Sequence, residues 1–335
     1  MTDDLQDLPP DEGIERFIRH REPSVRPSTL RNAKTRLNFF RAWCAERDIE
    51  NLNTLTGRDL SDFVAWRRGD IAAVTLQKQL STIRQALRYW ADIEGVRQGL
   101  AEKVHSPELP DGAESREEHL DAERAEDILE YYNRYHRGSR THAILTILWR
   151  TGMRRGALRS LDVEDLRPDD NAMVLRHRPE EGTRLKNGAN GERWVWLRPR
   201  HYEIVDAYLQ NPDRHDVTDD YGRKPLITSM HGRPSPNSIY DWVNKATRPC
   251  EIGGCPHDRD PDDCEAVGGS GVASKCPSSR SPHDIRRGSI TTHLNESTPP
   301  ETVSERMDVS LDVLYEHYDA RTAREKMEVR KNHLK

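Results

Sequence analysis

Apolar residues recur at steps of three and four along the first hundred residues, the spacing that places side chains on one face of a helix. Ser28 is the expected cap of the first helix, and Cys44 is expected to be a core thiol. A second helix is predicted over residues 56–69 and a third over residues 75–95. The pattern therefore predicts an all-helical bundle over residues 1–105. The apolar faces of the first and third helices consist of Leu30, Ala33, Leu37, Phe40 and Cys44, and of Leu80, Ile83, Leu87 and Trp90.

The pattern changes after this bundle. Residues 106–117 are polar and hold two prolines and one glycine, so we assign them as an interdomain linker. Residues 171–179 and 192–199 alternate between apolar and polar positions around a Gly- and Asn-rich turn, which predicts a β-hairpin. We expect an α+β domain over residues 118–335, in a fold that is mostly α with a small antiparallel β-sheet. Helical spacing also returns in two segments before the hairpin, residues 119–135 and 140–152.

Length and composition narrow the class of protein. A chain of 335 residues, 34% hydrophobic and 33% charged, is long enough for two domains with packed cores. No apolar run approaches ~18 residues, so we expect no membrane span. The acidic first residues lack the apolar region of a signal peptide. We therefore expect a cytoplasmic protein whose five cysteines are thiols or metal ligands rather than disulfides.

Charge is distributed unevenly along the chain. The formal net charge is −5, but residues 1–20 carry −4 while residues 21–105 carry 15 basic and 10 acidic side chains. A mildly basic domain behind an acidic leader can bind phosphate with one face. Of the 52 basic side chains 42 are arginine, whose planar fork suits bidentate phosphate contacts. Codon composition or adaptation to a salty cytoplasm would explain the same bias.

Four short motifs that hold candidate catalytic residues follow one another in the second domain. Each of them alone is a weak signal, but their joint order has few accidental explanations. Ser281 and Pro282 suit the start of a helix, and an N-terminus of a helix attracts anions. The elements are Arg154 after a helix that breaks at Gly152, Lys186 in the hairpin turn, His283 and Arg286 near that helix start, and the tyrosines Tyr315 and Tyr318.

In this order the residues resemble the tyrosine recombinase (phage integrase) family, and the resemblance covers most of the chain. It implies a helical core-binding (SAM-like) domain followed by an α+β catalytic domain. It also implies a site-specific recombinase that acts on double-stranded DNA and self-associates, as a tetramer on paired sites. The arginine-rich, lysine-poor composition is most similar to integrases of halophilic archaea.

The resemblance implies a role for each residue. Arg154 and Arg286 would hold the scissile phosphate while a tyrosine attacks phosphorus, leaving a 3′-phosphotyrosyl bond and a free 5′-hydroxyl. Guanidinium groups neutralise the charge that develops on phosphorus, and His283 adds to the positive field that activates a tyrosine. Lys186 would protonate the leaving 5′-oxygen. Because the covalent bond conserves the energy, we expect neither ATP nor a catalytic metal.

Spacing favours Tyr318 as the nucleophile, with Tyr315 as a packing residue on the same helix face. Two positions depart from the family. Ala157 stands where an acid often follows the first arginine, and Asp308 stands where a His or Trp often precedes the tyrosine helix. An ionised aspartate repels phosphate, so we expect Asp308 to orient His283 or Arg286 instead. These departures put full activity in doubt, though not membership of the family.

A cysteine-rich insert precedes the His283 helix. Its four sulfurs lie within 27 residues, in a Gly-, Pro- and Asp-rich loop that cannot build its own core. They suit a structural tetrahedral zinc site in which His257 replaces one thiol, although the spacing lacks the usual C-x-x-C pairs. Reduced loop thiols are the alternative. The four cysteines are Cys250, Cys255, Cys264 and Cys276.

Three other functions fit parts of the pattern. A relaxing topoisomerase would use the same tyrosine chemistry without a defined pair of sites. A DNA-binding protein that has lost catalysis would explain Asp308 and Ala157. A helical adaptor would leave the ordered arginines, lysine, histidine and tyrosine unexplained. The site-specific recombinase is therefore the leading prediction.

Overall fold

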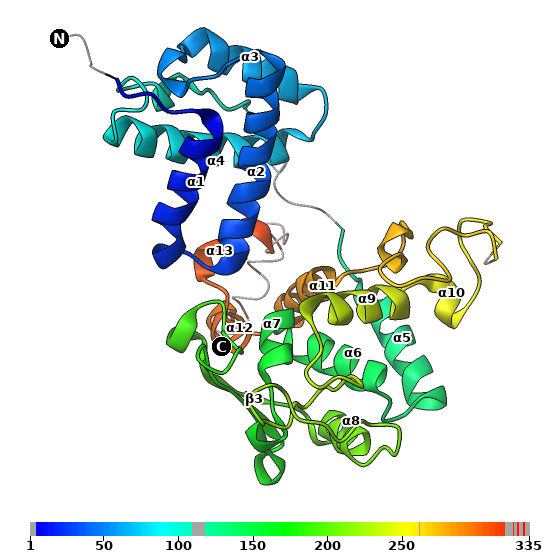
Figure 1. The fold of residues 1–335 in the computed structure, drawn as a ribbon. Coiled ribbons are helices and arrows are strands. Elements are labelled where there is room, and N and C mark those ends of the chain that lie inside the picture. Colours follow the sequence, from blue (N-terminus) through cyan, green and yellow to red (C-terminus); the bar gives the residue numbers. More distant parts are fainter. Residues whose placement is uncertain are drawn as a thin grey trace. The chain divides into compact units, whose positions relative to one another are not determined.

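The structure is a computed structural model that describes residues 5–108, 118–260 and 262–318, together with Arg324, Met327 and Lys331. The chain divides into two compact units, Met1–Arg116 and Glu117–Lys335 (Figure 1). Most of the expected linker, residues 109–117, lies outside the described residues. No helix in the described part of the chain is long and apolar enough to cross a membrane.

Within residues 5–108, the first unit contains four α-helices around one core. The predicted apolar positions Leu37, Phe40 and Trp90 are fully buried, and burial raises the pKa of Cys44 to about 12. The core thiol and the predicted helical bundle are therefore confirmed. The helix Pro10–Arg21 had no separate prediction. The helices are α1 (Pro10–Arg21), α2 (Pro27–Glu46), α3 (Gly57–Arg68) and α4 (Ala73–Asp92).

The predicted cap of α2 was wrong by two residues. The helix begins at Pro27, so Ser28 lies inside the first turn and Arg26 takes the cap position without a side-chain hydrogen bond. The fixed φ of proline suits the first helical position, where a missing N–H costs nothing. Proline, rather than the serine hydroxyl, therefore sets where this helix starts.

The second unit combines nine helices with a three-stranded antiparallel sheet of order β1-β2-β3 among the described residues. The predicted hairpin is confirmed, with Val174 opposite Trp194 and Met173 opposite Val195. The expected fold class, mostly α with a small antiparallel sheet, is confirmed as well. The elements are α5 (Ala122–Tyr135), α6 (Arg140–Thr151), α7 (Arg155–Ser160), β1 (Leu166–Arg167), β2 (Ala172–Leu175), β3 (Arg193–Trp196), α8 (Pro199–Leu209), α9 (Pro236–Ala246), α10 (Pro249–Ile252), α11 (Pro282–Asn295), α12 (Pro300–Met307) and α13 (Leu311–His317).

Helix α6 forms the centre of the second unit. Its residues are almost all buried, as its apolar sequence predicts, and it packs against α5, α8, α9 and α11 (Figure 1). Because α6 is held on several sides, its C-terminal end has a fixed position in the unit. The residues that follow that end include Arg154.

A buried ionic cluster joins the start of the hairpin turn to the loop between α8 and α9. Asp162 is fully buried and accepts hydrogen bonds from Arg233 and from Arg223, the latter at 3.1 Å. Arg178, which follows β2, lies 3.2 Å from the same carboxylate. Asp219 binds Arg233 at 2.8 Å. Since each buried charge has a partner, the cluster connects distant segments without leaving an isolated ion.

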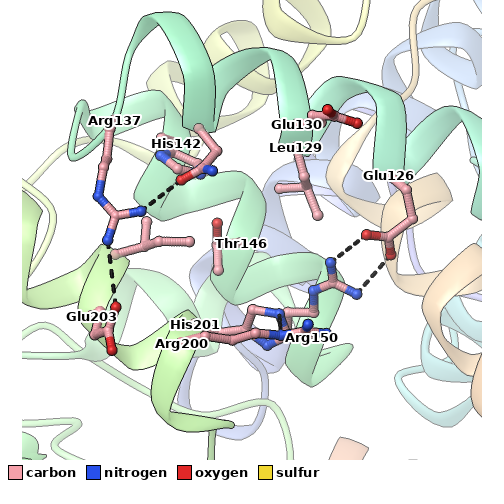
Figure 2. Close-up of a pocket in the computed structure, with 12 residues that line it drawn as sticks. Glu126, Leu129, Glu130, Arg137, His142, Thr146, Arg150, Arg200, His201 and Glu203 are labelled. Carbon is pink, nitrogen blue, oxygen red and sulfur yellow. Dashed lines mark hydrogen bonds and ion pairs between the residues drawn. The ribbon is translucent and has the colours of Figure 1, made fainter.

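A cavity of about 450 Å³ lies between α5, α6 and α8 (Figure 2). His142 of α6 lines it and is fully buried, and neither ring nitrogen has a hydrogen-bond partner among the described residues. Burial, aided by the charge of Arg137, lowers the pKa of His142 to about 4. The imidazole is therefore neutral in the folded protein at neutral pH.

His142 makes the stability of the fold dependent on pH. Between pH 6.5 and 4 the unfolded chain gains a proton at this histidine while the folded chain does not, so stability is lost as pH falls. His142→Leu should reduce the loss of unfolding free energy between pH 7 and pH 4.5 by about 2 kcal/mol. Urea unfolding at both pH values measures it. His231→Leu is the control, since that side chain is exposed; an equal change in both variants would contradict the assignment.

Candidate active site

A glycine at the end of α6 turns the chain toward Arg154. Gly152 has a φ of 58°, in the left-handed region that favours glycine, and its N–H donates to Leu148. A Cβ at this position would overlap the sulfur of Met307, so glycine also lets the end of α12 approach. Arg154 follows as the cap residue of α7. The predicted break of the helix at Gly152 is confirmed.

Helix α11 presents the predicted His283 and Arg286 from its first two turns. Ser281 caps it as predicted, and Asp284 completes a capping box by accepting from the Ser281 N–H at 2.8 Å. His283 is exposed, whereas Arg286 is only 2% exposed. One helix start therefore supplies one accessible imidazole and one buried guanidinium.

Arg286 joins three segments of the chain. Its Nη1 donates to the carbonyl of Gly152 at 2.7 Å and to that of Met307 at 2.5 Å. Desolvation and the charge of Arg154 lower the pKa of Arg286 to about 10, while Tyr318, its hydrogen-bond partner, acts in the opposite direction. The guanidinium thus stays charged at neutral pH and lies close to both Arg154 and Tyr318.

Asp308 contacts a different partner from the one expected. Its carboxylate accepts from Arg154 through Oδ2 and from the Asn187 amide through Oδ1, the latter at 2.6 Å. Only its main-chain carbonyl lies near Arg286, 3.4 Å from Nη2. The expectation that the side chain orients His283 or Arg286 was therefore wrong. Asp308 is the residue after α12 and has a φ of 55°, in the left-handed region.

Lys186 lies in the hairpin turn, as predicted, and its side chain is exposed. Desolvation lowers the pKa of His283, and the charges of Arg286, Arg287 and Lys186 act in the same direction, against Asp284. Lys186 is therefore close enough to His283 to affect its protonation. With its pKa below the usual value, His283 is mostly neutral at neutral pH, so the expectation that it adds to the positive field is not supported, and its ring keeps contact with solvent.

The two tyrosines have opposite environments. Tyr318 is 8% exposed and packs in an apolar cluster with Leu314, and Arg287 lies 5.8 Å from the centre of its ring. Tyr315 is 47% exposed, so the expectation that it packs on the same inward face was wrong. Helix α13 ends at His317, and Tyr318 follows with non-helical dihedral angles. Helical periodicity therefore does not set the direction of Tyr318.

Comparisons with known proteins identify the family of the chain. Residues 14–92 match the family described as phage integrase, N-terminal SAM-like domain. The N-terminal domain of a phage integrase/site-specific recombinase from Haloarcula marismortui is 35% identical over 30% of this chain and 99% of its own, with a TM-score of 0.30. The chain belongs to the tyrosine recombinase (phage integrase) family. The expected SAM-like domain is likewise confirmed.

Two further proteins are similar to larger parts of the chain. Tyrosine recombinase XerC of Escherichia coli O157:H7 is 23% identical over 189 residues, which are 55% of this chain and 62% of XerC. The alignment thus spans less than two thirds of that relative. A lambda integrase tetramer bound to a Holliday junction is 12% identical, covers 95% of this chain and 80% of its own, and has a TM-score of 0.66. At that identity the likeness shows the fold alone.

Three functional candidates in this recombinase fold escaped the sequence analysis: Asn187, Arg193 and Arg287. Arg193 donates to the carbonyls of Arg306 and Gly191, both at 2.8 Å. Desolvation lowers the pKa of Arg193 to about 10, with Asp308 opposing the shift and Arg154 adding to it. A signal existed, because the two-residue period of β3 puts Arg193 on the same face as the buried Val195.

The cysteine-rich insert shows a partial cluster. Burial raises the pKa of Cys250, with nearby Cys276 and Cys255 adding to the effect. The His257 Nε2 lies 3.1 Å from the hydroxyl of Ser278. Within the described ranges, no group of three or more His, Cys, Asp or Glu side chains is arranged to hold a metal ion. The zinc site therefore stays a prediction.

The buried contacts of Arg286 can be tested through stability. Arg286→Lys keeps the charge but loses the forked guanidinium, which leaves a buried carbonyl unpaired and should lower the unfolding free energy by about 1–3 kcal/mol. Chemical denaturation measures the change. Arg287→Lys, on the next and less buried position of α11, should cost less than about 0.5 kcal/mol. Equal losses would contradict a special structural role of Arg286.

Proposed function

We propose that the chain is a site-specific DNA recombinase that cuts and rejoins double-stranded DNA through a 3′-phosphotyrosyl intermediate. The observation that carries this proposal is the convergence of Arg154, Arg286 and Tyr318 from three separate segments, with Arg286 hydrogen-bonded to Tyr318. These residues also match the family pattern in order. A DNA substrate would place the protein in the cytoplasm.

Arg154 and Arg286 are the proposed phosphate-binding residues. A phosphodiester carries one negative charge, and the transition state for its cleavage carries about two. Arg154 and Arg286 provide two fixed positive charges, and Arg193 adds a third close by. Because Arg286 is already held by two carbonyls, it needs little rearrangement when charge develops on phosphorus.

Cleavage begins when the Tyr318 oxygen attacks phosphorus. The bond from phosphorus to the 5′-oxygen breaks. The phosphate stays bonded to the 3′-oxygen of the cut strand and is now also bonded to the Tyr318 oxygen. A free tyrosine has a pKa of ~10, so its ionisation needs assistance. Arg286, its hydrogen-bond partner, holds the tyrosine in place, and the neutral imidazole of His283 can accept the proton as the oxygen attacks.

The leaving 5′-oxygen needs a proton, and Lys186 is the proposed donor. The lysine is exposed on a turn near His283, so it can reach a bound strand without crossing the core. The 5′-hydroxyl of a second strand then attacks the phosphotyrosyl bond and releases Tyr318. The bond energy is conserved, which is why the reaction needs neither ATP nor a catalytic metal.

Self-association is part of the same proposal. One chain provides one nucleophile, whereas exchange between two duplexes cuts four strands. The lambda integrase structure holds a tetramer on a Holliday junction, and the similar fold supports the same assembly here. We therefore propose a tetramer on paired sites, with each subunit cutting one strand.

The nucleophile assignment is tested by a covalent adduct. A duplex selected for binding to the full chain is nicked near the cleavage site, so that the cut strand dissociates and traps the intermediate. Tyr318→Phe removes one oxygen and should reduce the adduct by about 10³-fold or more while leaving DNA binding nearly intact. Denaturing gels measure the adduct.

The matched control is Tyr315→Phe. Tyr315 is exposed and lies three residues earlier, so its variant should form the adduct at the wild-type level. An adduct in the Tyr318→Phe protein, or a phosphotyrosine mapped to Tyr315, would reverse the assignment. A wild-type chain that binds DNA but never forms an adduct would identify a non-catalytic DNA-binding protein instead.

We also propose a structural zinc ion in the cysteine-rich insert. Support comes from the closeness of Cys255 and Cys276 to Cys250, whose pKa they help to raise, while Cys264 is the proposed fourth ligand. Elemental analysis of the purified chain should find about one zinc per chain, and replacing Cys255 and Cys264 with serine should release it. Cys44→Ser is the control, since this thiol lies in the other core. Folded, active protein without zinc would contradict the proposal.

A further inference from the structure

Asp308 is a carboxylate in a site that is otherwise rich in arginine. Both its side-chain oxygens have donors, Arg154 on one and Asn187 on the other. The carboxylate is 14% exposed, so little solvent competes for these contacts. The charge of Arg193 also interacts with it. Asp308 is therefore the negative partner of more than one guanidinium.

These contacts resemble those of a phosphate. A phosphodiester has two non-bridging oxygens that share one charge, and a carboxylate has the same pair of acceptors. The Arg154 Nη1 that binds Asp308 is a donor that the proposed function assigns to the scissile phosphate. Two anions held against the same guanidinium repel each other, so the carboxylate and the phosphate compete for Arg154.

Asn187 extends the effect to the hairpin turn. It is the residue after Lys186, and its amide holds the turn to Asp308 at 2.6 Å, across 121 positions of the sequence. As long as this hydrogen bond persists, the turn stays close to the end of α12. Release of the carboxylate would also release the turn that carries the proposed proton donor.

We propose that Asp308 is an internal counter-ion that occupies the place of the scissile phosphate on Arg154 until DNA binds, and that Asn187 couples its release to the Lys186 turn. The inference rests on the proposed function, because it assigns Arg154 to the phosphate. Binding of the phosphate displaces the carboxylate, and the turn becomes able to move toward the 5′-oxygen. The lysine is thus made available only when a strand is in place.

A conservative substitution isolates the charge. Asp308→Asn has nearly the same shape and tolerates the left-handed φ of 55°, since Asn and Asp both adopt this region. The variant removes the anion that competes for Arg154 and leaves the backbone unchanged. DNA affinity should rise roughly tenfold at low salt, as expected for one hydrogen bond to a charged group. The slope of log DNA affinity against log salt concentration should become more negative by about one released counterion.

The experiment uses the full chain in a Tyr318→Phe background, so that binding is measured without cleavage. The wild-type adduct first maps the scissile phosphate. Two duplexes are then compared, one with that phosphodiester and one with an uncharged methylphosphonate at the same position. The gain from Asp308→Asn should appear on the phosphodiester duplex and be absent on the methylphosphonate duplex.

Glu126→Gln is the matched control. Glu126 also pairs with an arginine in the same unit, Arg150 at 2.7 Å, and its removal changes the net charge by the same amount. It should not distinguish the two duplexes. Asn187→Ala is a second variant, which leaves Asp308 in place and removes one of its hydrogen-bond donors. It should also raise affinity for the phosphodiester duplex, by a smaller factor.

The outcomes separate the two proposals. Unchanged or reduced affinity in Asp308→Asn and Asn187→Ala, or an equal gain on both duplexes, would overturn the counter-ion. If Asp308→Asn does not fold, Asn187→Ala decides alone by the same criterion. A wild-type chain that forms no adduct contradicts the proposed function, whereas an adduct without the phosphate-specific gain contradicts the counter-ion only.

Discussion

The buried guanidinium of Arg286 is the contact on which the rest of the catalytic unit depends. A charge removed from water is tolerated only when hydrogen bonds replace its hydration. Arg286 finds these partners in the carbonyls of Gly152 and Met307 and in Tyr318. Each partner belongs to a different segment, so satisfying one side chain fixes the ends of α6 and α12 and the tyrosine together.

Positive charge accumulates around this contact. Desolvation lowers the pKa of both Arg193 and Arg286 to about 10, and the charge of nearby Arg154 adds to the effect. Such a cluster is costly without an anion, which is the physical reason that it suits a phosphate whose charge increases during the reaction. In the chain without DNA, Asp308 provides part of the compensation. The same electrostatics thus account for the stability of the site and for its chemistry.

Several arginines of the second unit stabilise its fold by hydrogen bonds within the protein. Arg124 donates to the carbonyl of Ser278 at 2.6 Å, and Arg306 donates to that of Trp196 at 2.7 Å. Arg233 and Arg223 complete the buried cluster around Asp162. A guanidinium offers five donors in a rigid fork, whereas an ammonium offers three on one atom. Arginine can therefore join several loop carbonyls at once in a unit with little sheet.

The sequence by itself determined the elements and the order of the reactive residues. Helical and strand periods identified α2, α6 and the hairpin, and Ser281 identified the start of α11. These features depend on neighbours a few positions away, which the sequence displays directly.

Only the tertiary structure decided which of the reactive residues meet. The contact from Arg154 to Asp308 spans 154 positions, and that from Asn187 spans 121. Local periodicity carries no information on such distances, so the partner of Asp308 was misjudged. It also placed Tyr315 inward, because a helical period gives the relative directions of side chains but not which side of α13 is covered: Leu314 is buried and Tyr315 is exposed. Packing around α6 and the hydrogen-bond requirement of one buried arginine determine these contacts.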